Sequence, residues 1–247
     1  MPSNETGHEK NIANFKALIT YLESIGDKYQ PSKASLKLPA LITQYNEILQ
    51  ASTVLSKAKS PYSALVDVQE IAFEPLDKLL TRVIKNLRAS VDDPAEAETA
   101  ESLRNKIAGN TNSNRKKKSA DDTSVDPPVA DTTHSTSQRS YDYRTQNLND
   151  LILTLRSIPA YQPAEDEIAI DTLEALAIEL KKKVQDVDTV DVAVQNARIA
   201  RNSLLYVTKT GVLDTVDNVK EYIGSLFGAT SPQVRFINRL TFKKLPA

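Results

Sequence analysis

The chain has 247 residues, with six glycines, no tryptophan and no cysteine, and its 31 basic and 32 acidic side chains leave a net charge of −1. Scarce glycine and aromatic residues favour an all-α fold and exclude a sheet-rich one. Because the net charge is close to zero, the chain has no overall electrostatic field that would attract nucleic acid or an anionic membrane. The absence of cysteine excludes disulfides and thiolate chemistry. A reducing, cytoplasmic location fits this composition.

Polar residues fill the N-terminus, and we expect 1–10 to be a mobile leader rather than a signal peptide. Apolar residues at three- and four-residue steps from Ile12 predict a first amphipathic helix that Gly26 ends. No stretch is long and apolar enough to span a membrane, so we expect no membrane partner.

Two prolines divide the next helical pattern. Ser60 and Pro61 predict a new helix start, because serine caps a helix and proline suits its first position. Pro75 is expected to kink or divide the helix that follows. Asp93 and Pro94 then predict one short helix reaching about Ile107.

Residues 109–139 are rich in Ser, Thr, Asp, Asn and Pro, and we expect them to form a disordered polar linker. Such a stretch buries too little apolar surface to offset the entropy of ordering it. The linker contains a basic run, Arg115, Lys116, Lys117 and Lys118, which suits phosphate contact but also serves as a solubilising counterweight to the acidic stretch before it.

The first helical pattern occurs twice in the sequence. The segment 18–25, followed by Tyr29-Gln30-Pro31, returns as 151–158, followed by Tyr161-Gln162-Pro163. Further matches downstream predict an internal duplication, with homologous multi-helix units at 11–108 and 140–247. The units could form two tethered lobes or one antiparallel bundle with coiled coil-like packing, and we favour the bundle because each unit has a broad apolar face.

The duplicated layout and the segments 196–202 and 225–233 resemble an uncharacterised family of bacterial all-helical proteins with an internal duplication. The resemblance covers both halves and omits the linker. It implies the all-helical fold and assigns no ligand, cofactor or site residue.

No catalytic or metal-binding constellation is evident. The two histidines, His8 and His134, lie in segments expected to be disordered, and there is no phosphate-binding glycine loop. Asp186, Asp188 and Asp191 lie in a polar patch that indicates a helix break or a solvated face rather than a site. We therefore expect a protein that is not an enzyme and binds no cofactor or metal.

The C-terminal segment is the best candidate for binding. From Gly228 onward it contains Arg235, Arg239, Lys243 and Lys244, no acidic residue, and Phe236 and Phe242 between the cations. Cations with interleaved aromatic rings suit nucleic acid, whose phosphates they neutralise and whose bases stack on the rings. The alternative is that Phe236 and Leu240 pack on the helical core and leave the arginines exposed.

Two functions follow from these features. The first is a non-enzymatic helical scaffold or protein-interaction module, with a protein partner or self-association. The second is a nucleic-acid-associated protein that uses the basic C-terminal segment and the basic run of the linker.

Overall fold

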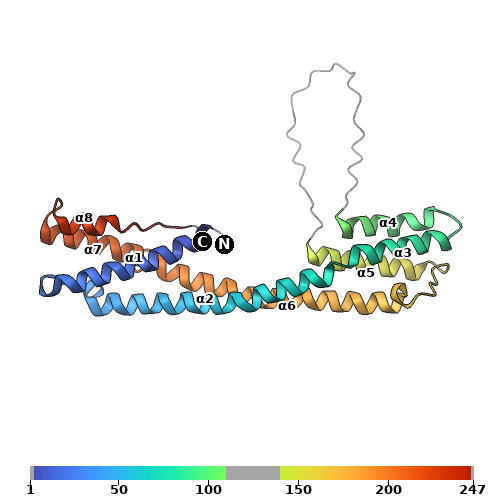
Figure 1. Cartoon of the computed structure of the whole chain (residues 1–247), viewed down its shortest axis with the longest axis horizontal. Helices are drawn as coiled ribbons and strands as arrows, with labels where there is room; N and C mark the ends of the chain where they lie inside the picture. Colours follow the sequence, from blue (N-terminus) through green and yellow to red (C-terminus); the bar gives the residue numbers. More distant parts are fainter. Residues whose placement is uncertain (1–2, 110–139, 246–247) are drawn as a thin grey trace, which may run out of the picture. The chain divides into compact units, whose positions relative to one another are not determined.

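The computed structural model describes residues 3–109 and 140–245, and these residues form eight α-helices, three short 3-10 helices and no strand (Figure 1). The first half contains α1 (Ser3–Ile25), η1 (Gly26–Lys28), η2 (Ala34–Leu36), α2 (Leu38–Phe73), α3 (Leu76–Ser90) and α4 (Ala95–Ala108). The second half contains α5 (Tyr141–Ser157), η3 (Asp166–Ile168), α6 (Ile170–Tyr206), α7 (Val212–Phe227) and α8 (Pro232–Arg239). The expected all-helical fold is confirmed, and none of the described helices is long and apolar enough to cross a membrane.

Helix ends follow the local signals in most places. Gly26 ends α1 at a φ of +62°, which glycine adopts without strain. Pro75 separates α2 from α3, and the Asp93 carboxylate caps α4 by accepting a hydrogen bond from the Ala95 amide at 2.9 Å. The Ser231 hydroxyl caps α8 by accepting from the Val234 amide at 3.2 Å.

Two expectations about helix starts were wrong. α1 begins at Ser3, inside the expected leader 1–10, because His8 and Asn11 are buried against other elements and hold this first part of the helix in place. α2 continues through Pro61 instead of restarting there. Leu55, on one side of this proline, belongs to a small buried cluster with Val194, and Tyr62, on the other side, packs against that cluster. We attribute the tolerance of the missing backbone hydrogen bond to this packing.

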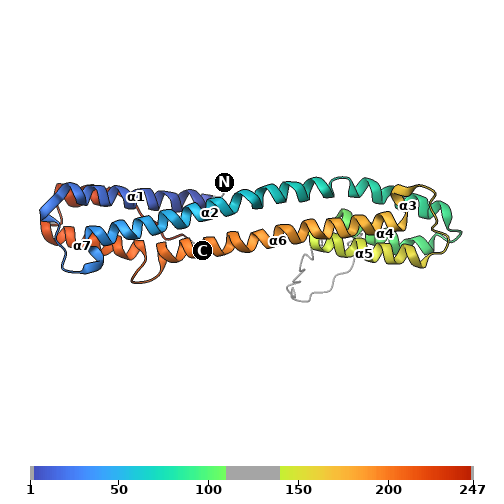
Figure 2. The same cartoon turned by 90° about the horizontal axis from the view of Figure 1, so that it is seen from below.

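The helices assort into two compact units, and each unit takes helices from both halves of the chain. Unit 1 comprises Met1–Ser63 and Thr189–Ala247, and unit 2 comprises Ala64–Asp188. These compact units differ from the contiguous ranges 11–108 and 140–247 expected as repeat units. α2 and α6 each contribute one part to each unit (Figure 2).

Each unit has its own hydrophobic core. The core of unit 1 gathers buried residues of α1, α2, α6, α7 and α8, among them Phe15, Leu18 and Val216. The core of unit 2 gathers buried residues of α2, α3, α4, α5 and α6, among them Leu80 and Leu151. No residue belongs to both cores, so the side chains that stabilise the two units by burial are different.

The repeated Tyr-Gln-Pro segments form the same turn in both units. The Tyr29 hydroxyl donates to the Leu36 carbonyl, and the Tyr161 hydroxyl donates to the Ile168 carbonyl, both at 2.7 Å. Each accepting residue is the last of a 3-10 helix, η2 or η3, that leads into a long helix. The tyrosine therefore closes the turn before α2 in unit 1 and before α6 in unit 2.

The linker expected at 109–139 lies outside the described residues except for Gly109, which ends α4 at a φ of +74°. The basic run Arg115, Lys116, Lys117 and Lys118 and the second histidine, His134, fall in the part that is not described.

Candidate functional site

The four C-terminal cations lie on unit 1 and are all exposed. Arg235 and Arg239 belong to α8, whose other face buries Val234 and Ile237 in the core of unit 1. Lys243 and Lys244 follow in an extended segment. None of the four forms an ion pair with a described residue, so their charges are available to a ligand.

Residues 240–245 form an extended segment, here called the C-terminal strap, that is bound to α1 by asparagine side chains. The Asn11 side-chain amide donates to the Lys243 carbonyl at 2.8 Å and accepts from the Lys243 amide at 3.1 Å. Asn14 donates to the Thr241 carbonyl at 2.7 Å. An asparagine amide has the donor and acceptor of a peptide group, so it pairs with extended backbone as a neighbouring strand would. The strap thereby positions Lys243 on unit 1.

A buried polar cluster lies beneath the strap. His8 and Arg201 are 2 % and 1 % exposed, and the His8 Nδ1 lies 2.7 Å from the Tyr206 hydroxyl. Asn11, which holds the strap, also donates to that hydroxyl at 3.1 Å. Burial raises the pKa of Tyr206, while the hydrogen bond from Asn11 and the charge of Arg201 oppose the rise. Sequence reasoning missed this cluster because it joins α1 to the end of α6.

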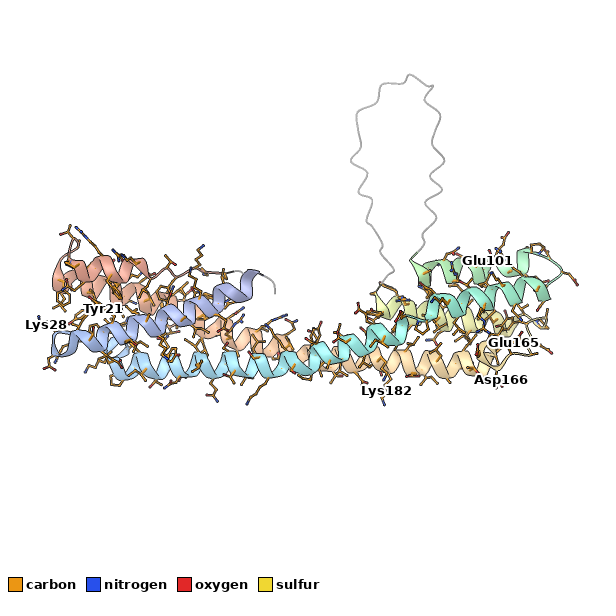
Figure 3. The ribbon with its side chains drawn as sticks, viewed as in Figure 1. Tyr21, Lys28, Glu101, Glu165, Asp166 and Lys182 are labelled. Carbon is orange, nitrogen blue, oxygen red and sulfur yellow. The ribbon has the colours of Figure 1, made fainter. Side chains whose placement is uncertain are left out.

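An open groove of about 490 Å³ lies between α1 and α8. Its wall on α1 includes the small residues Ala13 and Ala17, with Lys16 and Tyr21, and its wall on α8 is Phe236. The Phe236 ring is 42 % exposed and its centroid lies 4.4 Å from that of Tyr21, on the α8 side of α1 (Figure 3). An exposed ring beside exposed cations is the arrangement that stacks on an unpaired base.

The alternative prediction for the C-terminal segment, that Phe236 and Leu240 pack on the helical core, holds only in part. Leu240 and Phe242 are partly buried and pack against the core of unit 1, and the Lys220 ammonium lies 5.5 Å from the centroid of the Phe242 ring. Phe236 differs, because it packs on Tyr21 at the surface instead of entering the core. The core contacts of α8 are made by Val234 and Ile237 instead.

The acidic patch on α6 is helical, so the alternative of a helix break at this patch is wrong. Asp186, Asp188 and Asp191 lie within the uninterrupted helix α6, and the Asp191 carboxylate accepts from the Gln195 side chain at 3.1 Å. Within 3–109 and 140–245, no group of three or more His, Asp or Glu side chains is placed to hold a metal ion.

Comparison of the chain with models of protein families, with curated proteins and with solved structures found no match. The family resemblance noted in the sequence therefore stays a prediction, and any function must be argued from the geometry of the chain itself.

Proposed function

We propose that this chain is a non-enzymatic helical interaction module whose binding surface lies on unit 1 and whose partner is single-stranded nucleic acid. The observation that carries the proposal is the set of exposed cations Arg235, Arg239, Lys243 and Lys244, none paired with a described residue, on the same C-terminal segment as the exposed ring of Phe236. Phosphates would lie against the cations and an unpaired base would stack on the ring.

The distribution of charge supports unit 1 as the binding unit. Unit 1 contains 15 Lys and Arg against 9 Asp and Glu, whereas unit 2 contains 16 against 23. The chain is near neutral only because a unit with net charge +6 is joined to one with net charge −7. A polyanion is attracted to unit 1 and repelled by unit 2, which orients its approach.

The experiment is a fluorescence-anisotropy titration of labelled mixed-sequence single strands and duplexes of DNA and RNA, at about 50 and 200 mM salt. The test variant replaces Arg235, Arg239, Lys243 and Lys244 with Gln. The matched control replaces Lys78, Lys85, Lys181 and Lys182, four exposed cations of unit 2, with Gln.

The chain is expected to bind single strands, and the test variant is expected to bind roughly tenfold or more weakly at the lower salt. For the test variant, the slope of the logarithm of the binding constant against the logarithm of the salt concentration should become less steep by about 0.7 for each phosphate that is no longer neutralised. Phe236→Ala should weaken binding with an unchanged salt slope, because it removes stacking and no charge. The proposal is wrong if no binding occurs at the lower salt, or if the control loses as much affinity as the test variant.

A self-associating scaffold is the second candidate, and one stripe on α6 favours it. Val192 and Ile199 of α6 are 59 % and 67 % exposed, and with Asn196 and Ser203 they follow three- and four-residue steps along α6 in unit 1. Val207, the residue after this helix, is 45 % exposed. This uncharged stripe has the spacing of a helix-packing seam. Static light scattering tests it: a mass above one chain that Val192→Glu with Ile199→Glu reduces to one chain would support self-association, and a single-chain mass for the unchanged protein would refute it.

We also propose that the two halves arose by duplication and exchanged helices. Under an offset of 132 residues, η2 and α2 correspond to η3 and α6, and the matched turns include the two tyrosine hydrogen bonds. In each unit the 3-10 helix of one half contacts a helix of the other half, η2 with α7 and η3 with α3. The four apolar positions of α3 that match α7, Leu76, Leu80, Val83 and Leu87, are buried as are their counterparts Val212, Val216, Val219 and Ile223.

A further inference from the structure

A second cavity in unit 1 is separate from the basic groove. It has a volume of about 330 Å³ and lies between the start of α2, the loop after α6 and the first turns of α7. Its lining includes Lys33, Ser35, Gln44, Lys209, Thr215 and Asn218. Both charged residues of this lining are lysines, and Asp214 and Asp217 line the adjoining shallower part together with the same two lysines.

The loop that forms one wall is held from two sides. Lys209 adopts a φ of +76°, an unusual conformation for a residue with a side chain, and its amide donates to the Asp214 carboxylate of α7 at 2.5 Å. From α2, the Gln44 side chain donates to the Thr210 carbonyl at 3.0 Å. The wall is therefore fixed before any ligand arrives.

Thr215 is a buried polar group without a partner in this cavity. The residue is 6 % exposed and lines the cavity, and its hydroxyl makes no hydrogen bond with a described residue. The hydroxyl is not among the fully buried side-chain atoms that lack a partner, so it borders the open space of the cavity, where a ligand oxygen can accept its hydrogen bond.

The corresponding place in unit 2 has side chains of a different kind. In the register of the proposed duplication, Ser35 and Asn218 correspond to Glu167 and Arg82, which form an ion pair. Gln44 and Thr215 correspond to Leu176 and Leu79, which pack against the core of unit 2. Unit 1 thus has uncharged polar side chains where unit 2 has an ion pair and two leucines, and one of them, Asn218, donates to the Asp214 carbonyl at 2.7 Å.

The charge of the turn is reversed as well. Lys33 corresponds to Glu165, which precedes Asp166 and Glu167 at the turn before α6, where Glu165 and Asp166 lie at one end of unit 2 (Figure 3). Where unit 2 presents three carboxylates at this turn, unit 1 presents a lysine.

We propose that this cavity binds a small anion, the phosphate or carboxylate group of a small molecule. Lys33 and Lys209 balance its charge, and the side chains of Thr215, Asn218 and Ser35 donate hydrogen bonds to its oxygens. The cavity continues outward into a shallower part that is lined by Asp214 and Asp217 as well. Asp214 and Asp217 offset part of the charge of Lys33 and Lys209, so the site favours a single anionic group over the many phosphates of the nucleic acid proposed for the α1–α8 surface.

The test is an amide chemical-shift titration of the full chain at low ionic strength, with inorganic phosphate in one series and acetate in the other. Saturable chemical-shift changes of the amides between Lys209 and Asn218 are expected in at least one series. The anion that binds with the lower dissociation constant shows which chemical group the cavity prefers. Lys33→Gln with Lys209→Gly should weaken binding roughly tenfold or more, because the double variant removes both cations that face the anion. Glycine keeps the positive φ at position 209.

Thr215→Val keeps the shape of the side chain and removes the hydroxyl, so it should weaken binding severalfold without loss of thermal stability. The control, Lys28→Gln with Lys37→Gln, changes two exposed lysines outside the cavity and should leave binding unchanged. Absence of saturable shifts in both series overturns the proposal, as does equal weakening by the control. The double variant Lys33→Gln with Lys209→Gly should retain its affinity for single-stranded nucleic acid. The anion-binding proposal and the nucleic-acid proposal can therefore fail independently of each other.

Discussion

Tyr29 and Tyr161 explain why the Tyr-Gln-Pro segment occurs twice. Both residues are buried, and each hydroxyl bonds the carbonyl seven residues later, at the end of the 3-10 helix. This carbonyl would otherwise be a buried acceptor without a partner. The tyrosine thus supplies a hydrogen bond and an apolar ring to the same turn.

Tyr29→Phe and Tyr161→Phe should each lower the free energy of unfolding by about 1–3 kcal/mol, because each leaves a buried carbonyl unsatisfied. Urea denaturation measures the change. Tyr143→Phe, at a site that is 50 % exposed, is the control and should change the value by less than about 0.5 kcal/mol. Equal effects at all three positions would refute this account of the turn.

Stability should fall at high pH through the Tyr161 hydroxyl. Burial, with a smaller contribution from Glu165, raises the pKa of Tyr161 to about 12 from its ordinary value of about 10. Because the folded pKa is the higher one, the stabilising contribution is complete below about pH 10 and is lost as the pH rises toward 12.

The measurement is the difference in unfolding free energy between the unchanged chain and Tyr161→Phe, which cancels the titration of the lysines. The difference should be constant in neutral solution and shrink above about pH 10. A difference that is independent of pH throughout this range would contradict the raised pKa.

Long helices and one strap connect distant parts of the chain within unit 1. Asn11 and Asn14 bind the strap by its backbone, while Leu245 lies against Gly7, where an added Cβ would approach the Leu245 side chain to 2.6 Å. The small residue at position 7 therefore leaves room for the strap. The prolines show the same influence of packing, since Pro75 interrupts the helix but Pro61 does not.

Asn11→Ala should release the strap from the middle of α1. Amide hydrogen exchange by NMR should show the Lys243 amide exchanging roughly tenfold faster or more, because the variant lacks the side-chain oxygen that accepts from this amide. Asn46→Ala, on the exposed side of α2, is the control. Unchanged protection of Lys243 would show that other interactions hold the strap, and faster exchange throughout α7 would indicate unfolding instead.

Among residues 3–109 and 140–245, the main core of unit 1 and that of unit 2 share no residue, and neither is built from one continuous half of the sequence. Leu18 in α1 and Leu151 in α5 occupy matching positions of the repeated pattern, and each is completely buried in a different unit. Substitutions at these two matched positions therefore test whether the two units are stabilised independently of each other.

Leu18→Ala and Leu151→Ala should each cost about 2–5 kcal/mol in the unit that contains the residue. Native-state hydrogen exchange should show faster exchange in α1 and α7 for the first variant, and in α3 and α5 for the second. If both variants accelerate exchange equally in all these helices, the chain unfolds as a single cooperative unit and the separation is wrong.

The sequence by itself determined the helical faces, the repetition of the Tyr-Gln-Pro segment, and the helix ends at Gly26 and Pro75. It also identified the exposed cations of the C-terminal segment. These features depend on residues a few positions apart, so hydrophobic spacing and capping chemistry are enough to predict them.

Only the tertiary structure decided which helices share a core, that α2 continues through Pro61, and that the expected leader is part of α1. It also revealed the buried cluster, where His8 contacts a residue 198 positions away, and the strap, where Asn11 contacts one 232 positions away. Periodicity shows that a helix has a face to bury and says nothing of which distant segment covers it. That choice depends on how complementary side chains pack across the whole chain.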